Sequence, residues 1–519
     1  MKYTKKTIFA LAVLMLTLTG CEDFLNKPAI SDLSNVGFWK QEGDVKSWLA
    51  GTYLGIQSVL SENYLQWGEA RSDNFYVTSY GNTQIKMNSL VSTLGFCNWE
   101  DLYKVINRCN VGIENTAKVP GMLSATTNSY LGQFYGIRAL MYFYAIRIWG
   151  SVPLVTNTWN GDLTTKYGSR TDLNLIEEQI LSDIDQAASM LDNQGVFYFN
   201  KGAALALKTD FLMYQKKYQE ALDVTSELIK MSRYDWVKTP KEWRDIFINP
   251  SVSKETIFTL FWDYTANGKN GYGALVAATD KQPSYAMSAN MFRLVVKNKK
   301  DVRFWGVLDT LTIYNAIGKH QITDMAVLDP RTSTFTHSNS INKFYEMDPN
   351  PYTVLTSTAL NPFIRKAQND CDFKLPIYRY ADVMLMRAEA LNKLDRGQEA
   401  IDIIVKVRSR CGNTNVPLLA NYPVRDGYET NSLERLILEE RQVEFYGEGK
   451  RWFDLFRTGL TKVVMDPALK EMQYINNEEP VGFVLGDSTG LGRILFPISN
   501  SAFQANPTLR GHQNLPYSE

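Results

Sequence analysis

The segment of residues 436–459, LILEERQVEFYGEGKRWFDLFRTG, constrains the fold more than any other part of the chain. Its first half follows Asn431 and Ser432 and carries apolar residues at helical spacing, so we predict a helix for which Ser432 is the better N-cap. Gly447 and Gly449 then interrupt the apolar pattern before it resumes. The sequence therefore predicts a helix, a break and a second helix.

Charged residues of both signs share this segment. They are mostly three or four positions apart: Glu440, Arg441, Glu444, Glu448, Arg451, Asp454 and Arg457. Side chains at this spacing are neighbours on a helix and form ion pairs. Two interpretations follow, a structural polar network that braces the corner, or a pair of carboxylates that act as catalytic acid and base. The alternating signs favour the structural network, because opposite charges neutralise each other.

The same segment resembles a motif of the SusD/RagB family of nutrient-binding outer-membrane lipoproteins, E-R-x-x-E-F-x-x-E-G-x-R-W-x-D-L-x-R. The C-terminus resembles the closing motif of that family, with Ser499 in place of the usual second proline. The matching residues are Glu440, Arg441, Glu444, Phe445, Glu448, Gly449, Arg451, Trp452, Asp454, Leu455 and Arg457, and then Leu495, Pro497, Ile498, Asn506, Pro507, Leu509, Gln513 and Asn514. The resemblance implies a helical-repeat scaffold that binds a ligand without chemistry.

The N-terminus has the pattern of a bacterial lipoprotein signal. A basic start precedes an apolar stretch at residues 8–18, which is too short to span a bilayer. Residues 18–21, Leu-Thr-Gly-Cys, have the form of a lipobox, so we predict that Cys21 is the lipidated N-terminus of the mature protein. An ordinary secretory signal with a coincidental cysteine is the alternative. Glu22 and Asp23 resemble the acidic signal that directs such lipoproteins to the cell surface.

Charge and residue counts argue against several functions. Basic and acidic residues number 55 each, so no basic field attracts nucleic acid. The chain has three histidines and no HExxH motif, so we expect no zinc site and no cofactor. Cys97 and Cys109 flank a predicted helix that would hold them roughly 18 Å apart, so we predict that they do not form a disulfide.

Helical periodicity recurs along the chain. We expect a first helix capped by Asp44 and further helices at residues 98–118, 129–148 and 173–191. Two segments share a layout of two helices joined by a short turn, with Gln-Glu-Ala at the start of each second helix. These segments are residues 201–230 and 380–410. A small residue at that point lets paired helices approach, which is typical of tetratricopeptide-like repeats. The predicted fold is mostly α, a tetratricopeptide-like scaffold with loop-rich insertions and a few short strands.

These patterns divide the chain into a signal peptide, a tether and one large domain. Periodicity fades in the middle of that domain, where only residues 255–263 look like a strand, and long loops in compact domains are usually functional. The predicted boundaries are 1–20 for the signal peptide, 21–42 for the lipid anchor and tether, and 43–519 for the SusD-like domain, with helical repeats at about 43–232 and 377–459, a ligand-binding insertion at about 234–376 and a C-terminal segment at 460–519.

Aromatic rings in polar loops are the candidate ligand contacts. Aromatic residues make up 12% of the chain, and those in helical patterns, such as Trp99, are expected in the core. Rings beside amide side chains in turn-rich surroundings are left for a surface platform, on which a sugar or peptide would stack. The predicted ligand-binding residues are Tyr76, Tyr80, Asn82 and Gln84 in one loop, and Tyr264, Tyr272 and Tyr285 in another.

The favoured function is capture of a nutrient oligomer at the cell surface. The resemblance implies a lipid-anchored outer-membrane protein that binds a glycan, or alternatively a peptide, and delivers it to a SusC-like TonB-dependent outer-membrane transporter. A secreted polysaccharide hydrolase and a helical-repeat scaffold without a ligand are the alternatives. We predict that the protein is not an enzyme, because the sequence has no nucleophile-elbow, zinc or Cys-His signature.

Overall fold

The structure is a computed structural model that describes most of the chain after residue 34. The described ranges are 35–78, 81–158, 168–193, 195–268, 270–276, 284–295, 297, 301–307, 341, 343–344, 347–348, 364–365, 374–475 and 492–518. The predicted signal peptide, Cys21 and most of the tether lie outside these ranges. None of the described helices is both long enough and apolar enough to cross a membrane.

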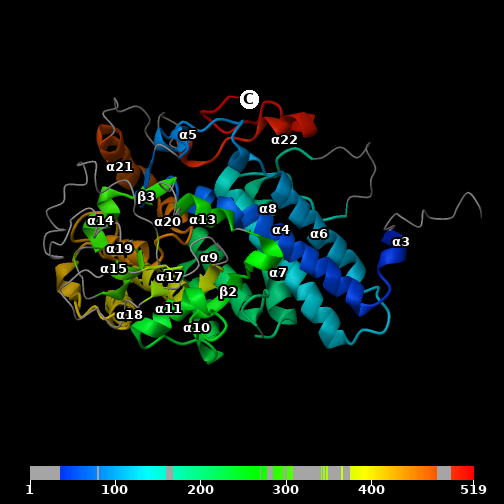
Figure 1. The fold of residues 1–519 in the computed structure, drawn as a ribbon, viewed down its shortest axis with the longest axis horizontal. Coiled ribbons are helices and arrows are strands. Elements are labelled where there is room, and N and C mark those ends of the chain that lie inside the picture. The colour runs from blue at the N-terminus through cyan, green and yellow to red at the C-terminus, as the bar shows by residue number, and fades with distance from the viewer. Residues whose placement is uncertain are drawn as a thin grey trace, which may run out of the picture.

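Helices dominate the N-terminal half, as their periodicity predicts (Figure 1). The elements are α3 (Asn35–Phe38), α4 (Glu42–Gly68), β1 (Phe75–Val77), α5 (Thr83–Lys86), η1 (Gly95–Cys97), α6 (Glu100–Thr116), α7 (Ser124–Trp149), α8 (Leu173–Met190), α9 (Lys201–Tyr214) and α10 (Tyr218–Lys230). The three helices predicted between residues 98 and 191 correspond to α6, α7 and α8. Cys97 and Cys109 are buried free thiols, so the prediction that they form no disulfide is confirmed.

The start of α4 differs from the prediction. Asp44 is not the N-cap, because the helix begins at Glu42 and Gln41 holds the cap position. The Asp44 carboxylate instead reaches back from the first turn and accepts hydrogen bonds from the backbone amides of Lys40 and Gln41, at 3.0 and 2.9 Å. An acidic side chain in this position satisfies amides that have no partner within the helix.

Helix α7 is the centre of the N-terminal half. Its residues from Gly132 to Trp149 are all buried apart from Tyr135, because apolar side chains surround the helix over this length. Both α6 and α8 pack against it, and α4 packs on α6. Gly150 ends the helix with a φ of 73°, a left-handed conformation that glycine adopts without strain.

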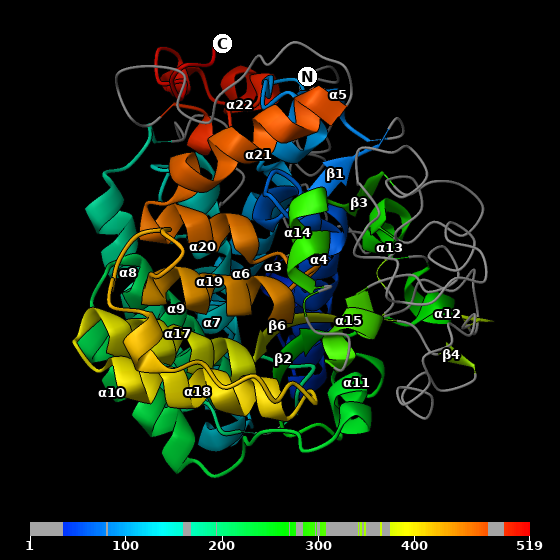
Figure 2. The same ribbon diagram turned by 90° about the vertical axis from the view of Figure 1, so that its left-hand side faces the viewer.

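The insertion between the two helical halves contains short elements. They are α11 (Pro240–Ile248), β2 (Thr256–Leu260), α12 (Tyr264–Asn267), α13 (Gly271–Val276), β3 (Tyr285–Met287), α14 (Ala289–Val295), α15 (Val302–Val307), β4 (Met347–Asp348) and β5 (Ile364–Arg365). The predicted strand is confirmed as β2, whereas the region predicted as continuous loop includes α12 and α13. Figure 2 shows α12, α13 and α15 on one side of the helical scaffold.

The C-terminal half repeats the helical arrangement. Its elements are β6 (Leu375–Arg379), α17 (Tyr380–Lys393), α18 (Gly397–Ser409), η4 (Leu419–Asn421), α19 (Leu433–Glu444), α20 (Arg451–Thr458), α21 (Thr461–Ile475), η5 (Gly492–Ile494), α22 (Asn500–Ala505) and η6 (Pro507–Leu509). Strand β6 pairs antiparallel with β2, so the chain leaves the scaffold and returns to it at one place.

The two predicted helical hairpins lie side by side. Helix α10 of the first packs on α17 of the second, although the insertion separates them in sequence. The Arg387 guanidinium of α17 donates to the carbonyl oxygen of Leu222 in α10, at 3.0 Å. Ala221 and Ala400, the small residues of the two Gln-Glu-Ala motifs, are both buried. The hairpins therefore form one continuous stack, and the mostly α, helical-repeat fold is confirmed.

Candidate ligand-binding cleft

The segment of residues 436–459 forms a corner that docks on the end of α4. Ser432 caps α19 as predicted, and its hydroxyl accepts from the Arg435 amide at 3.3 Å. Between α19 and α20, Gly447 and Gly449 have φ values of 77° and 64°. Their amides donate to the two carboxylate oxygens of Glu69, both at 2.7 Å. The glycines permit left-handed backbone at the point where the corner meets α4.

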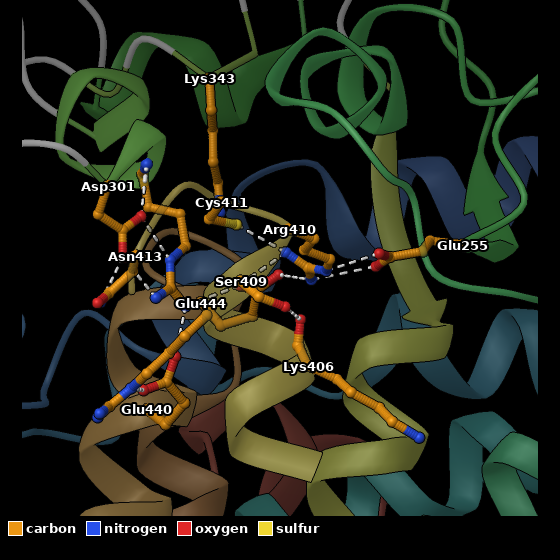
Figure 3. Close-up of polar contacts among 12 residues, drawn as sticks. Glu255, Asp301, Lys343, Lys406, Ser409, Arg410, Cys411, Asn413, Glu440 and Glu444 are labelled. Carbon is orange, nitrogen blue, oxygen red and sulfur yellow. Dashed lines mark hydrogen bonds and ion pairs between the residues drawn. The ribbon is translucent and has the colours of Figure 1, made fainter. Parts of the chain in front are cut away.

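Glu444 is the centre of a buried charge network beneath this corner (Figure 3). Its carboxylate lies 2.6 Å from Arg379 Nη1 and 2.7 Å from Arg410 Nη2, and Arg410 also donates to Glu255. Burial alone would raise the pKa of the Glu444 carboxyl, but the guanidinium groups of Arg410, Arg379 and Arg303 hold this pKa well below its ordinary value. Glu444 therefore stays ionised, whereas a general acid must carry a proton.

The network also ties the insertion to the scaffold. Arg303 of α15 donates to Glu440 of α19 at 2.7 Å and to Asp301 beside it. Glu440 is buried and accepts a second bond from Arg408, at 2.6 Å. The carboxylates of this segment are thus committed to arginines inside the protein. Their arrangement supports the structural interpretation of the charged motif over the catalytic one.

A large open cleft lies elsewhere, beside the C-terminal half of α4. Its volume is about 880 Å³, which is the size of a small-molecule or oligosaccharide site. One wall comes from α4, a second from the N-cap of α5 together with η1 and the residue before it, and a third from the segment after β2. The lining residues are Leu54, Gln57, Ser58, Ser61, Glu62, Asn63, Gln66, Asn82, Leu94, Gly95, Phe96, Trp262, Ala266 and Asn267.

The α4 wall is a polar stripe that sequence reasoning missed. Gln57 and Ser61 recur on the side of the helix away from its apolar residues, which face the core, whereas the lining residue Gln66 is itself buried. Two polar stripe residues, Ser58 and Glu62, lie four positions apart, which places them one above the other. The signal was available, because the predicted apolar face leaves a complementary face composed mainly of amides and hydroxyls.

Hydrogen bonds fix the cleft side chains in place. Gln57 Nε2 donates to the Phe261 carbonyl oxygen, and Gln57 Oε1 accepts from Asn267 Nδ2 at 3.4 Å. Ser61 accepts from the Gly271 amide at 2.9 Å. These bonds join α4 to the wall that follows β2. Among the described residues Asn63 has no hydrogen-bond partner, so its amide is available to a ligand.

The two loops predicted to bind ligand do meet at this cleft. Strands β1 and β3 pair antiparallel, with Tyr76 opposite Ala286 and Val77 opposite Tyr285. Asn82, one of the predicted ligand residues, lines the cleft and also caps α5 by accepting from the Ile85 amide at 3.1 Å. Asn82 is the one predicted ligand-binding residue among the described lining residues, and ligand binding by these two loops stays a prediction.

The predicted aromatic platform is wrong for three of its tyrosines. Tyr76, Tyr272 and Tyr285 are 8%, 0% and 1% exposed, so they offer no surface to a ligand in this conformation. Tyr285 donates to Gln66 at 2.9 Å and so positions a cleft residue, while Tyr272 donates to the Gly447 carbonyl oxygen beneath the corner. Burial of an aromatic ring in the core is more favourable than exposure to water, and the hydroxyls of Tyr272 and Tyr285 each have an internal acceptor.

The other predicted residues are Gln84, Tyr80 and Tyr264. Gln84 lies in α5, partly exposed, and does not line the cleft. Tyr80 and the side chain of Tyr264 lie outside the described parts of the chain. Their role in ligand binding remains a prediction.

Trp67 is buried, and its indole nitrogen donates to the Phe96 carbonyl oxygen at 2.7 Å, which supports the cleft wall from behind.

Comparison with known proteins identifies the family to which this architecture belongs. One family profile, the SusD family, matches residues 362–517, and a second, described as starch-binding and associating with the outer membrane, matches residues 23–212. A SusD-like protein of Formosa agariphila is 28% identical over 533 residues, which span 98% of each chain. The chain belongs to the SusD family.

Solved structures share the SusD fold with this chain. A SusD superfamily protein from Bacteroides thetaiotaomicron has a TM-score of 0.68 at 22% identity, covering 92% of this chain and 99% of its own. A second structure, described as a laminarin-binding SusD-like protein, has a TM-score of 0.68 at 21% identity. The match covers 92% of this chain and 100% of that protein's chain. The resemblance seen in the sequence motifs is therefore confirmed.

The closing motif of this SusD-family chain acts structurally. Asn514 Nδ2 donates to the carbonyl oxygens of Trp149 and Phe496, at 2.9 and 2.8 Å. Gln513 makes two hydrogen bonds with the backbone of Ile498, which lies beside Ser499. Ser499 does not disturb the turn, because its hydroxyl caps α22 by accepting from the Ala502 amide. The motif thus fastens the C-terminal segment to the end of α7.

The two profile matches leave out residues 213–361, which contain most of the insertion. The cleft therefore has two kinds of wall. The α4 and α5–η1 walls lie within a matched range, whereas Trp262, Ala266 and Asn267 lie outside both. A family scaffold thus carries one half of the cleft, and the insertion supplies the other.

Proposed function

We propose that this SusD-family protein binds an oligosaccharide at the cell surface without chemistry and delivers it to a SusC-like TonB-dependent outer-membrane transporter. The observation that carries the proposal is the cleft of about 880 Å³, in which amides and hydroxyls of α4 share the lining with Phe96 and Trp262. Such side chains both donate and accept hydrogen bonds, as sugar hydroxyls require. A peptide ligand, whose backbone also pairs with amides, is the second candidate.

The charges in the cleft support binding over hydrolysis. Glu62 is the single carboxylate among the described lining residues, whereas glycoside hydrolysis ordinarily requires two carboxyl groups flanking the bond. The acidic residues of the corner motif are buried in ion pairs with arginines, far into the protein interior. The similarity to a laminarin-binding SusD-like fold agrees with binding as the function.

A glycan array combined with a peptide-binding screen tests this proposal. The full-length protein in detergent should retain at least one oligosaccharide series and leave it uncleaved, as judged by chromatography of the incubated glycan. Cleavage would indicate a hydrolase, and retention of peptides alone would favour the second candidate. Binding of neither class would favour a helical scaffold without a nutrient ligand.

A single amide tests the location of the site. Asn63→Ala removes one available hydrogen-bonding group from the cleft and should weaken glycan binding by about three- to tenfold, as expected for a neutral hydrogen bond. Asn421→Ala, an exposed position in η4 on another face, is the matched control and should bind like wild type. Equal affinity of Asn63→Ala and Asn421→Ala would place the site elsewhere.

Anchoring and delivery follow from the sequence motifs. We propose that acylated Cys21 holds the domain of residues 43–519 to the outer membrane through the tether, and that the protein covers its transporter and opens by a hinge near residues 22–42. Affinity purification from solubilised outer membrane should recover a TonB-dependent transporter. Recovery of the protein alone, under conditions that preserve known transporter complexes, would contradict this part of the proposal.

A further inference from the structure

Two exposed aromatic rings lie next to the cleft and belong to none of its walls. Tyr198 is 56% exposed and Phe261 is 43% exposed, and they are the exposed aromatic side chains of the described residues. Other described aromatic residues are buried or half-buried. Rings this exposed use only part of their surface for packing, so their position beside a binding cleft points to contact with a ligand.

Both rings are held by the elements that form the cleft. The carbonyl oxygen of Phe261 accepts from Gln57, and the next residue, Trp262, lines the cleft. Tyr198 packs edge-to-face on Tyr53 of α4, at 5.5 Å between ring centroids, and Tyr53 immediately precedes the cleft residue Leu54. The rings and the cleft therefore share the same stretch of α4.

Contacts within the protein hold Tyr198 and Phe261 in place. The Thr259 amide donates to the Val196 carbonyl oxygen at 2.9 Å, so the segment with Tyr198 runs beside the end of β2. The Phe197 and Phe261 rings meet edge-to-face at 5.1 Å and 80°. Rings held this way lose little conformational freedom on binding, which favours their use as stacking surfaces.

We infer that Tyr198 and Phe261 form an aromatic ledge that extends the cleft and binds further sugar units of a long oligosaccharide. The C–H faces of pyranose rings fit exposed aromatic faces. The Lys374 ammonium lies over one face of the Phe261 ring, 5.7 Å from its centroid, which leaves the opposite face for stacking and offers donors to sugar hydroxyls. Leu54, itself 56% exposed, adds apolar surface to the lining of the cleft. The inference rests on the proposed glycan-binding function and adds a preference for longer chains.

Chain-length dependence of binding tests the ledge. The glycan array identifies the oligosaccharide series that wild type binds. Calorimetry then measures the affinity for members of that series from two to about ten sugar units. Wild type should gain affinity beyond the length that fills the cleft. Tyr198→Ala and Phe261→Ala should each remove about fivefold of affinity for the longest members, as expected for one stacked ring, and leave the shortest members unchanged.

Two further variants separate stacking from folding. Tyr198→Leu and Phe261→Leu keep apolar bulk without a ring, so each should resemble its alanine counterpart in affinity and wild type in thermal stability. Leu123→Ala, at an exposed leucine elsewhere, is the control and should change nothing. If wild type binds glycans and the ring variants lose equal affinity for short and long members, or none at all, the ledge is overturned and the glycan-binding function stands. If wild type binds no glycan, or only peptides, both are overturned.

Discussion

Replacing Gly68 by alanine should destabilise the protein, whereas the same replacement at Gly51 should stabilise it. Both glycines lie in α4. A Cβ added to Gly51 meets no atom within 4 Å, but one added to Gly68 would lie 2.0 Å from the carbonyl oxygen of Gly449 and 2.5 Å from its carbonyl carbon. Backbone atoms have no alternative rotamer, and Glu69 holds this backbone through two hydrogen bonds. The helix end and the corner must therefore move apart.

The magnitude follows from two opposing effects. Alanine is better than glycine inside a helix by about 0.5–1 kcal/mol, and Gly51→Ala should show this gain alone. Gly68→Ala receives at most the same gain and also overpacks the contact, which costs about 1–3 kcal/mol and sometimes more. The unfolding free energies of the two variants should thus differ by at least about 1–3 kcal/mol, with Gly68→Ala the less stable.

Urea unfolding of both variants and wild type, followed by tryptophan fluorescence and circular dichroism, measures this difference. Coincident transitions by the two probes would justify a single unfolding free energy for each protein. The contact between α4 and the corner predicts the order Gly51→Ala, wild type, Gly68→Ala from most to least stable. Equal stability of the two variants would refute the reasoning, because it would mean that the helix end and the corner do not press together in solution.

Three further predictions concern buried charges and the anchor. Asp382→Asn removes the partner of Arg441 and Lys450, so it should destabilise the protein by about 3–5 kcal/mol at neutral pH in urea unfolding. Burial alone would raise the pKa of Asp382, but Lys450 and Arg441 lower it. The difference in unfolding free energy between wild type and Asp382→Asn should therefore shrink as pH falls below about 4, where the carboxyl of the unfolded chain becomes protonated. Burial raises the pKa of Glu69 to about 7, so wild type should lose stability between about pH 4.5, where the unfolded carboxyl ionises, and pH 7. Glu69→Gln removes this dependence, and its stability relative to wild type should rise across that window; a constant difference would contradict the buried, protonated carboxyl. Cys21→Ala should release or misprocess the protein, and unchanged membrane fractionation of that variant would argue against lipidation at this residue.

Local patterns were enough to predict the scaffold. The helices between residues 98 and 191 and the N-cap at Ser432 follow from apolar periodicity and capping chemistry, which depend on residues only a few positions apart. The break at Gly447 and Gly449 was likewise visible, because glycine interrupts a helical pattern wherever it occurs. The family resemblance rested on the same segments. Helix formation and capping depend on nearby residues, so the sequence by itself determines most of them, although the cap of α4 was predicted at Asp44 and lies at Gln41.

The function of the tyrosines was decided by tertiary structure. Tyr272 and Tyr285 stand among polar, turn-rich residues in the sequence, which suggested exposed rings. Both are buried because the loops that carry them fold back onto α4 and the corner, where Gln66 and the Gly447 carbonyl oxygen accept their hydroxyls. Which ring is exposed depends on contacts with residues more than a hundred positions away, and no local pattern reports such contacts.

The cleft itself also exists only in the folded chain. Its α4 stripe could have been found from the sequence as the polar complement of the apolar face, yet α4 by itself is a convex surface. Asn82 and Asn267 come from segments that β1, β2 and β3 bring to that stripe. Gln57 holds the segment that follows β2 through a hydrogen bond with Asn267. A concave site requires walls from distant parts of the chain, and their approach is set by the packing of the insertion on the helical scaffold.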